Sequence, residues 1–370
     1  MEVQNLIVGA GLTGAVLAER LASQLNENVL IIDRRAHIAG NCYDYKSDCN
    51  ITIQKYGPHI IHTNNKKVWD YLSMFTDWHY FILKTNVFID NTLTSIPFNL
   101  NSIHDLFPQS LANAMEQKLI QKYKYGTKVS ILDMLNSDDD ILKFLADFIY
   151  EKMFKNYTYK QWGTYPDQID PHVLSRVPVS ISKNDGYFDD IYQGIPLFGY
   201  SNMIKNMLSH PKISIILNID FLNMNKVTYK RLFYTGSIDE YFSYKYGILP
   251  YRSLKFDIKK KDIEYYQNVT TIRYPNNYDF TRVYEHKYFL NEKSQNTYIS
   301  FEYPENFIIG YNDRFYPIAN NENYKIYDKY KNDSKNLKNV FFCGRLGEYK
   351  YYNMDIIVQK ALDLFSTIKN

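Results

Sequence analysis

The sequence predicts an α/β protein built on a Rossmann-like dinucleotide-binding domain, and three observations support this fold class. A short apolar run at residues 5–8 is followed by a G-x-G-x-x-G pattern at residues 9–14 and then by apolar residues at helical spacing. A second apolar run at 29–32 ends at Asp33, which completes a β-α-β unit. Short apolar runs return late in the chain, as at 340–342, so both ends contribute to one predicted sheet.

The remaining elements follow from periodicity and from turn residues. Apolar spacing predicts helices at 112–124 and 138–156, which form a helical component in the middle of the chain. Proline and glycine predict loops at 163–171 and 193–199. Further short runs and a last periodic stretch predict strands at 213–217 and 231–234 and a terminal helix at 354–368.

Each glycine of the first turn has a separate predicted role. Gly9 permits the tight turn, Gly11 lets the backbone approach a pyrophosphate, and Gly14 allows close packing of helix on strand. The helix that follows directs its N-terminal N–H groups at the phosphates. Asp33 is expected to accept hydrogen bonds from a ribose 2′-hydroxyl. At this point both NAD and FAD remain open.

Length and composition predict an ordinary globular protein, either of two or three domain-sized parts or of one elaborated α/β body. The chain has 370 residues and a formal charge of +3, from 43 Lys and Arg against 40 Asp and Glu, which argues against a dedicated nucleic-acid binder. Three irregularly spaced cysteines predict no disulfide framework. The N-terminal apolar run is interrupted by glycines and has no cationic start, so we expect no signal peptide, no membrane span and a cytoplasmic protein.

Two histidines, His59 and His62, have a spacing that suggests a metal pair. No third or fourth ligand of suitable spacing accompanies them, so we predict no metal site. The alternative to a binding role is a pair of structural histidines with satisfied hydrogen bonds.

Two segments, at 35–41 and 342–345, are similar to flavoprotein segments that wrap a long cofactor, which favours FAD. Six further segments follow in order along the chain: KYGPHIIHTN (55–64), YTYKQWG (157–163), RVPV (176–179), YQGIP (192–196), YRSL (251–254) and EYKYY (348–352). Together these six segments resemble UDP-galactopyranose mutases, and the similarity covers about residues 6–364.

The resemblance implies a Rossmann-like FAD-binding domain with an inserted helical domain and an antiparallel-sheet domain. We expect the FAD domain to combine residues 1–80, 210–245 and 335–370, and the helical domain to span 100–165. The sheet or substrate domain would then comprise residues 80–100, 165–210 and 246–334, with a mobile lid near 168–179.

The resemblance also implies an isomerase that interconverts UDP-galactopyranose and UDP-galactofuranose. In this family the N5 atom of reduced FAD attacks the anomeric carbon, with no net redox, and NADH or NADPH is the expected reductant. We expect a UDP-sugar as substrate and a homodimer or other homo-oligomer as the assembly. The alternatives are a mutase for UDP-N-acetylgalactosamine or a deoxy or pentose sugar, a net flavin oxidoreductase, and a non-catalytic nucleotide-sugar binder.

Site residues follow by matching positions. Arg176, in the predicted lid, and Arg282 would clamp the diphosphate, because a guanidinium is a planar, permanently charged fork. His62 would lie against the flavin and complete the catalytic set. The other implied substrate contacts are Asn86, Phe154, Tyr157, Trp162, Tyr187, Tyr316, Tyr351 and His59. Besides the three glycines, the implied cofactor contacts are Asp33, Arg34, Gly40, Asn41, His62, Gly236, Arg345 and Met354.

Three positions depart from the family pattern. Ala39 replaces a glycine beside the cofactor, and its methyl group is tolerable if its φ is negative. Pro58 replaces a small residue before His59, and Asn353 stands where an aspartate is common. These changes surround the predicted pocket, which leaves the identity of the sugar open.

Overall fold

The computed structural model describes residues 2–166, 178–224, 227–318 and 320–369, and it separates two compact units. Unit 1 combines Met1–Phe81, Asp190–Tyr251 and Phe307–Asn370. Unit 2 combines Ile82–Asp189 and Arg252–Asn306. Each unit is therefore assembled from stretches that are distant in the sequence.

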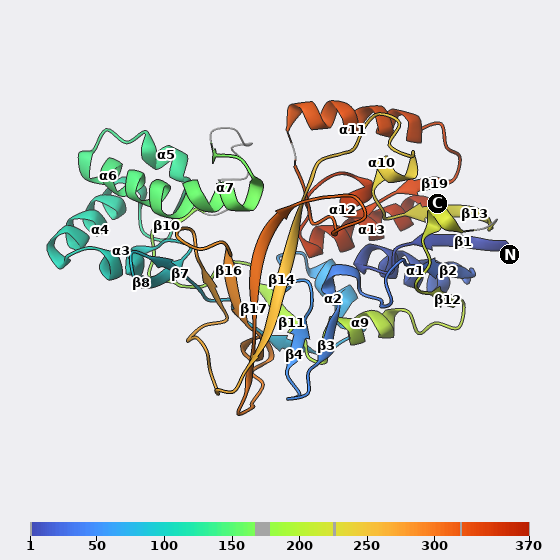
Figure 1. Ribbon diagram of the computed structural model, residues 1–370, viewed down its shortest axis with the longest axis horizontal. Helices are drawn as coiled ribbons and strands as arrows, with labels where there is room; N and C mark the ends of the chain where they lie inside the picture. Colours follow the sequence, from blue (N-terminus) through green and yellow to red (C-terminus); the bar gives the residue numbers. More distant parts are fainter. Residues whose placement is uncertain (1, 167–177, 225–226, 319, 370) are drawn as a thin grey trace. The chain divides into compact units, whose positions relative to one another are not determined.

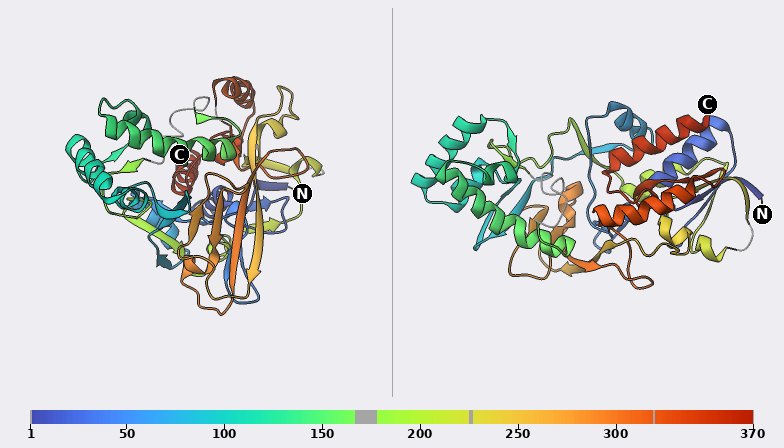
Figure 2. Two further views of the ribbon diagram at one scale, coloured as in Figure 1. Left: turned by 60° about the vertical axis from the view of Figure 1, so that its left-hand side comes forward. Right: turned by 90° about the horizontal axis from the view of Figure 1, so that it is seen from above.

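Unit 1 is organised around a parallel sheet with the strand order β12-β2-β1-β13-β19 (Figure 1). The helices α1 and α13 pack against each other beside this sheet, as Figure 2 shows from a second direction. All four residues of β2 are buried, as expected for a parallel strand covered on both faces. The strands are β1 (Glu2–Val8), β2 (Val29–Ile32), β12 (Ile213–Ile216), β13 (Thr228–Tyr234) and β19 (Val340–Phe342), and the helices are α1 (Leu12–Leu25) and α13 (Met354–Lys369).

The predicted β-α-β unit is confirmed. The apolar run at 29–32 is strand β2, and helix α1 begins directly after Gly11. This helix ends at Asn26, which adopts a left-handed conformation with φ of 55°. Gly9 N–H donates to the Ile32 carbonyl at 2.8 Å, which joins the glycine turn to the end of the neighbouring strand.

A second sheet in unit 1 corrects the loop predicted at 193–199. Residues Tyr192–Pro196 form strand β11, which lies between β5 (Ile61–Thr63) and β6 (Trp78–Tyr80) in an antiparallel sheet. A Cβ atom on Gly194 would lie 3.1 Å from the His79 carbonyl oxygen and 3.2 Å from the Trp69 ring. The glycine therefore marks close packing within a strand, and strand pairing overrides the turn signal.

The other elements of unit 1 surround these two sheets. The predicted boundaries had put residues 192–207 and 321–334 with the sheet domain, whereas here β11 pairs within unit 1 and Tyr330 packs in a unit 1 core cluster. These elements are β3 (Asp44–Lys46), β4 (Thr52–Gln54), β5 (Ile61–Thr63), α2 (Lys66–Ser73), β6 (Trp78–Tyr80), α9 (Tyr200–Met207), α10 (Ile238–Tyr241), β18 (Tyr316–Pro317), α11 (Asn321–Ser334) and α12 (Gly344–Gly347).

Unit 2 contains a helical part with its own apolar core. The helix predicted at 138–156 is longer and irregular: α6 (Asp140–Ile149) continues as a π-helical segment, Tyr150–Lys155, and then as α7 (Asn156–Trp162). The helix ends at Gly163, whose φ of 74° provides a left-handed cap. The remaining elements of this part are α3 (Leu100–Leu106), α4 (Gln109–Tyr123), β9 (Lys128–Val129), α5 (Ile131–Leu135) and β10 (Val179–Ser180).

Unit 2 also contains a largely antiparallel sheet in the order β14-β17-β16-β15-β7-β8. The pairing of β15 with β7 is parallel, and the other pairings are antiparallel. Its strands are β7 (Thr85–Ile89), β8 (Thr92–Ile96), β14 (Tyr251–Lys261), β15 (Thr271–Arg273), β16 (Arg282–Glu285) and β17 (Thr297–Asn306).

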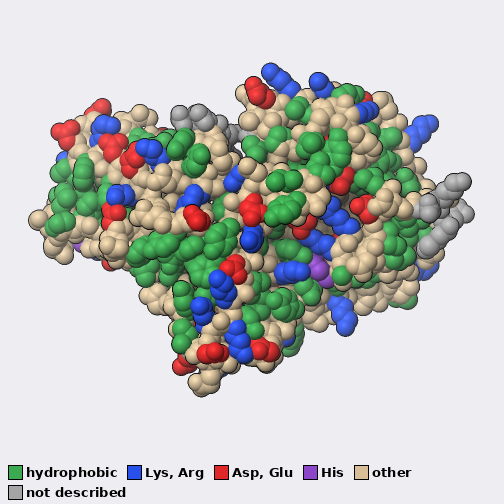
Figure 3. Space-filling model, viewed as in Figure 1, with side chains coloured by type: hydrophobic (Ala, Val, Ile, Leu, Met, Phe, Trp, Pro, Cys, Tyr) green, Lys and Arg blue, Asp and Glu red, His purple; other side chains and the backbone are tan. Residues whose placement is uncertain are grey.

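The surface carries charges of both signs. Basic and acidic side chains are interspersed on the face drawn in Figure 3. Within the part of the chain that the structure describes, no helix is both long and apolar enough to cross a membrane.

Candidate functional site

A pocket in unit 1 opens where β1, β2 and β13 end, and the glycine turn forms one wall of it. Gly9 has φ of 107°, and a Cβ atom there would lie 2.0 Å from the Thr235 hydroxyl oxygen. That hydroxyl donates to the Val8 carbonyl at 2.7 Å and is thereby fixed. A side chain at position 9 is excluded both by conformation and by space.

Two further glycines bring backbone segments close together. A Cβ atom on Gly14 would lie 2.0 Å from the Gly9 carbonyl oxygen. A side chain at position 14 would therefore prevent helix α1 from lying this close to the turn. A Cβ atom on Gly40, whose φ is 54°, would lie 3.0 Å from the Gly11 Cα atom. The loop that carries Gly40 and Asn41 therefore closes over the start of α1.

The start of α1 is suited to a pyrophosphate. No described side chain caps this helix end, and its first turn contains no acidic residue. The N-terminal N–H groups and the helix dipole are thus left for an anion. The residues present fit the phosphate portion of a dinucleotide.

Asp33 and Arg34 both line this pocket at the end of β2. The Asp33 carboxylate accepts from Ala10 N–H and from Arg35 N–H, each at 2.8 Å. Each oxygen keeps a second lone pair that a ribose hydroxyl could use. Arg34 is half exposed and pairs with Asp313 at 3.3 Å.

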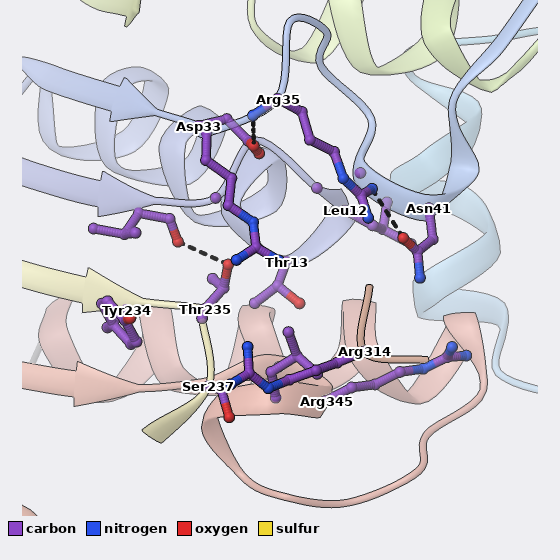
Figure 4. Close-up of a pocket in the computed structure, with 18 of the residues that line it drawn as sticks. Leu12, Thr13, Asp33, Arg35, Asn41, Tyr234, Thr235, Ser237, Arg314 and Arg345 are labelled. Atoms are coloured by element: carbon purple, nitrogen blue, oxygen red, sulfur yellow. Dashed lines mark hydrogen bonds between the residues drawn. The ribbon is translucent and has the colours of Figure 1, made fainter. Parts of the chain in front are cut away.

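Arg35, the first residue of the predicted cofactor-wrapping segment 35–41, also lines the pocket, as do two charged residues that sequence reasoning missed, Arg314 and Glu240. Figure 4 shows Arg314 and Arg345 across the pocket from Asp33 and Arg35. The Arg314 side chain is 3% exposed and pairs with Glu240 at 3.1 Å, while its Nε atom is buried without a partner among the described residues. No motif surrounds Arg314 or Glu240 in the sequence, so no signal could have identified them.

The pocket lining also includes Arg345, Asn41, Met354 and His59. Burial, assisted by the Arg345 charge, lowers the pKa of His59 to about 4, so this imidazole is neutral at physiological pH. The guanidinium of Arg345 lies 4.7 Å from the centre of the Tyr351 ring, and its Nε donates to the Tyr352 carbonyl. Arg345 is thus held at the pocket wall by contacts with the segment that follows it.

Burial has the opposite effect on a neighbouring thiol. It raises the pKa of Cys42 to about 12, although the Arg345 charge opposes the shift. Cys42 is therefore a neutral thiol that packs against the pocket.

The predicted catalytic residue His62 is on β5 and is not among the described residues that line this pocket. Its Nδ1 atom lies 2.7 Å from an Asp190 carboxylate oxygen, and the second oxygen of Asp190 accepts from Asn64 at 3.0 Å. The strand β5 and the chain just before β11 thus fix the orientation of the His62 ring.

The backbone conformation of Ala39 differs from the one expected. We expected a negative φ at this departure from the family glycine, but Ala39 has φ of 73° and ψ of 0°. Its N–H donates to the Ala10 carbonyl at 2.8 Å and its carbonyl accepts from Cys42 N–H at 2.9 Å, so the loop geometry imposes this conformation. The methyl group is accommodated with about 1–2 kcal/mol of backbone strain.

In unit 2 the predicted Arg282 lies in a network of aromatic hydroxyls. Its Nε donates to the Tyr157 hydroxyl at 2.6 Å and its Nη1 donates to the Tyr284 hydroxyl at 3.1 Å. The same Nη1 lies 3.4 Å from the Glu302 carboxylate, which also accepts from Tyr284. Burial raises the pKa values of Tyr157 and Tyr284, so both phenols stay protonated. Arg282 and Tyr157, which were both predicted to contact the substrate, are therefore in direct contact with each other.

Other predicted substrate residues are distributed more widely. Phe154 packs in the core of the helical part and is 8% exposed. Asn86 pairs with Ile272, one register step from the pair of Val87 with Arg273, so it faces away from the Arg273 face of the sheet.

The remaining predicted positions occur in both units. In unit 2, Trp162 ends α7, and Tyr187 packs edge to face with Phe188. In unit 1, the ring centres of Tyr316 and Tyr351 lie 5.5 Å apart. Arg176 and most of the predicted lid lie outside the described residues.

Gly236, another predicted cofactor contact, also lines the pocket, whereas Gly14 is not among the described residues that line it. Among the residues that the structure describes, no cluster of three or more His, Cys, Asp and Glu side chains could hold a metal ion.

The parallel sheet, the glycine turn and the pocket at its strand ends define a dinucleotide-binding protein of the Rossmann type. In agreement, residues 7–75 match the sequence model of the NAD(P)-binding Rossmann-like domain. Residues 152–351 match the model of UDP-galactopyranose mutase, more than half of the chain.

Known proteins agree with this match. A probable UDP-galactopyranose mutase of Klebsiella pneumoniae is 35% identical over 96% of this chain and 92% of its own. A dTDP-fucopyranose mutase of Escherichia coli is 32% identical over 97% of this chain and 96% of its own. A crystal structure of reduced UDP-galactopyranose mutase superposes with a TM-score of 0.76 at 14% identity, covering 100% of this chain and 94% of that one. The chain belongs to the UDP-galactopyranose mutase family, and the protein is an enzyme of the isomerase class.

Proposed function

We propose that this enzyme interconverts UDP-galactopyranose and UDP-galactofuranose with the help of reduced FAD. The observation that carries the proposal is the family match, which includes 35% identity to a probable UDP-galactopyranose mutase along almost the entire chain. The pocket of unit 1 supports the cofactor assignment, because its glycine turn, its uncapped helix start and the extent of its lining fit a dinucleotide.

The residues of unit 1 supply binding and orientation of the flavin in this proposal. When bound and reduced, FAD offers its N5 atom as a nucleophile to the anomeric carbon, with no net redox. Gly9 and Gly11 would admit the pyrophosphate, Gly14 would keep the helix close to the turn, and Asp33 would hold a ribose hydroxyl. Arg345, which also lines the pocket, would place a positive charge near the flavin ring and favour its anionic reduced form.

The residues of unit 2 would bind the nucleotide sugar. Arg282 has a permanent charge, and its contact with the Tyr157 hydroxyl fixes its orientation, so it is suited to stabilise a departing diphosphate. Arg176 would provide a second guanidinium from the lid. NADH or NADPH as reductant, a cytoplasmic location and a homo-oligomeric assembly remain part of the proposal.

A second candidate substrate is a 6-deoxy sugar on a different nucleotide. The relative at 32% identity is a dTDP-fucopyranose mutase, so the family accommodates changes in both base and sugar. Ala39, Pro58 and Asn353 also depart from the pattern that UDP-galactopyranose mutases share.

A substrate panel tests the proposal. Protein reduced with dithionite is incubated with UDP-galactose, UDP-N-acetylgalactosamine, a UDP-pentose and dTDP-fucose, and the furanose forms are separated by chromatography. We expect the highest kcat/KM with UDP-galactose. A higher kcat/KM with another sugar would identify that sugar, and not UDP-galactose, as the substrate. Absence of every furanose form would refute the mutase assignment.

A further inference from the structure

Arg273, which no sequence motif marked, lies beside the predicted diphosphate clamp. It ends β15 and pairs directly with Arg282 on β16, and Arg282 in turn pairs with Glu302 on β17. Residues in directly opposite register project from the same face of a sheet. The three side chains therefore form one row of two guanidinium groups and one carboxylate.

The partners in this row are unevenly distributed. Arg282 contacts the hydroxyls of Tyr157 and Tyr284 and the Glu302 carboxylate, and Glu302 also accepts from Thr281 at 2.9 Å. Like charges placed directly opposite each other destabilise a sheet, and a single carboxylate that is already used cannot neutralise both arginines. The row thus has an excess of positive charge on a half-buried surface.

Arg273 itself makes no side-chain hydrogen bond or ion pair with any residue that the structure describes, and its Nε atom is buried. Its guanidinium instead lies 4.8 Å from the centre of the Tyr187 ring and 5.9 Å from the centre of the Tyr157 ring. Two aromatic rings therefore hold the side chain, while its five N–H donors have no acceptor within the described part of the chain. A buried donor without an acceptor is unfavourable unless a ligand supplies one.

We infer that Arg273 is a substrate-binding residue whose guanidinium donates to a phosphoryl oxygen of the nucleotide-sugar diphosphate. The planar fork matches two oxygens of a phosphate, and contact with Tyr187 and Tyr157 fixes the plane of the fork before the ligand arrives. The diphosphate carries the negative charge that this row lacks. The inference rests on the proposed function, because it assigns the ligand of the same site.

The competing explanation is purely structural: Arg273 would only support the two tyrosine rings. Loss of that support would weaken binding of every ligand by the same factor, whether or not it carries phosphate. A phosphate-binding role instead makes the loss grow with the number of phosphates.

The test measures binding of uridine, UMP and UDP to the full-length holoprotein by isothermal titration calorimetry. The variants are Arg273→Gln, which removes the charge, and Arg273→Lys, which keeps the charge without the fork. Lys255→Gln is the matched control, because it removes one positive charge from an exposed position on β14 of the same sheet.

We expect Arg273→Gln to weaken UDP binding by about 10- to 100-fold and uridine binding by less than about twofold. Arg273→Lys should cause a loss of about 3- to 10-fold for UDP and remains measurable if the glutamine variant folds poorly. Lys255→Gln should leave all three affinities unchanged.

Two results would overturn the inference: UDP affinity within about twofold of wild type in both Arg273 variants, or equal losses for uridine, UMP and UDP. Either result would leave the proposed function intact if wild-type protein binds UDP and interconverts the sugar rings. Failure of wild-type protein to bind UDP would refute the proposed function itself and this assignment with it.

Discussion

Acidification is predicted to destabilise unit 1 through His59. Burial, with the Arg345 charge, lowers the pKa of His59 to about 4, whereas a histidine in the unfolded chain has a pKa of about 6.5. Between these values the unfolded chain binds a proton that the folded protein does not. The free energy of unfolding therefore falls as pH drops through 6.5, and the loss is complete below about pH 4. At 1.36 kcal/mol per pKa unit, the loss between pH 7.5 and pH 5 is about 2 kcal/mol.

Substitution of His59 by Gln isolates this contribution. The His59 Nδ1 atom lies 2.8 Å from the Gly57 carbonyl, and a glutamine amide can retain that hydrogen bond without titrating. Urea unfolding at pH 7.5 and pH 5 gives the free energy of unfolding of wild type and variant, and carboxylate titrations common to both cancel in the difference. We expect the difference to change by about 2 kcal/mol in favour of the variant at pH 5.

A matched comparison is available in unit 2. Burial lowers the pKa of His286 to about 3, so His286→Gln should show a change of the same sign. If the difference between wild type and His59→Gln is the same at both pH values within about 0.5 kcal/mol, the histidine titrates normally and the reasoning is refuted.

Three further predictions concern the glycine turn, its neighbouring loop and the histidine on β5. Ala39→Gly should raise the free energy of unfolding by about 0.5 kcal/mol. Glycine relieves the backbone strain of the left-handed conformation, and this gain exceeds the stabilisation that is lost because glycine makes the unfolded chain more flexible. The control Ala15→Gly, in helix α1, should lower the free energy of unfolding by about 1 kcal/mol. If both variants lowered Tm by the same amount, the account of Ala39 would be contradicted. Gly14→Ala places a methyl group 2.0 Å from a carbonyl oxygen, so purified protein should carry about tenfold less flavin by absorbance, and wild-type flavin content would refute the steric argument. Asp190→Asn should lower kcat/KM about tenfold, the equivalent of one charge-assisted hydrogen bond to His62, and unchanged kinetics would exclude a positioning role.

The parts of the fold that sequence predicts well are those that local physics determines. The run Val29–Ile32 is apolar without alternation because both faces of β2 are covered, and its limits agree with the prediction. Gly9 and Gly14 occupy positions where a Cβ atom would overlap fixed atoms, so their pattern is informative. Strand β11 was missed because Gly194 and Pro196 resemble turn residues, and its pairing with β5 and β6 depends on segments more than a hundred residues away.

The site residues also divide into those that sequence motifs suggest and those that only tertiary contacts bring to the site. Arg282 was predicted from its family-like position, but Arg314, Glu240 and Arg273 come from segments without a motif. Their surroundings arise from tertiary contacts: Arg314 pairs with Glu240 across distant segments, and Arg273 meets Tyr187 through the sheet of unit 2. The conformation of Ala39 was also beyond local reasoning, because backbone hydrogen bonds to Ala10 and Cys42 impose it.

The most direct test of the central claim is the fate of UDP-galactofuranose when it is mixed with reduced protein in the absence of further reductant. Proton NMR of the anomeric signals distinguishes the furanose from the pyranose. The account predicts many turnovers to UDP-galactopyranose per reduced flavin, and little conversion by the oxidised protein. Equal conversion by the oxidised protein, or consumption of one reductant for each molecule converted, would contradict it.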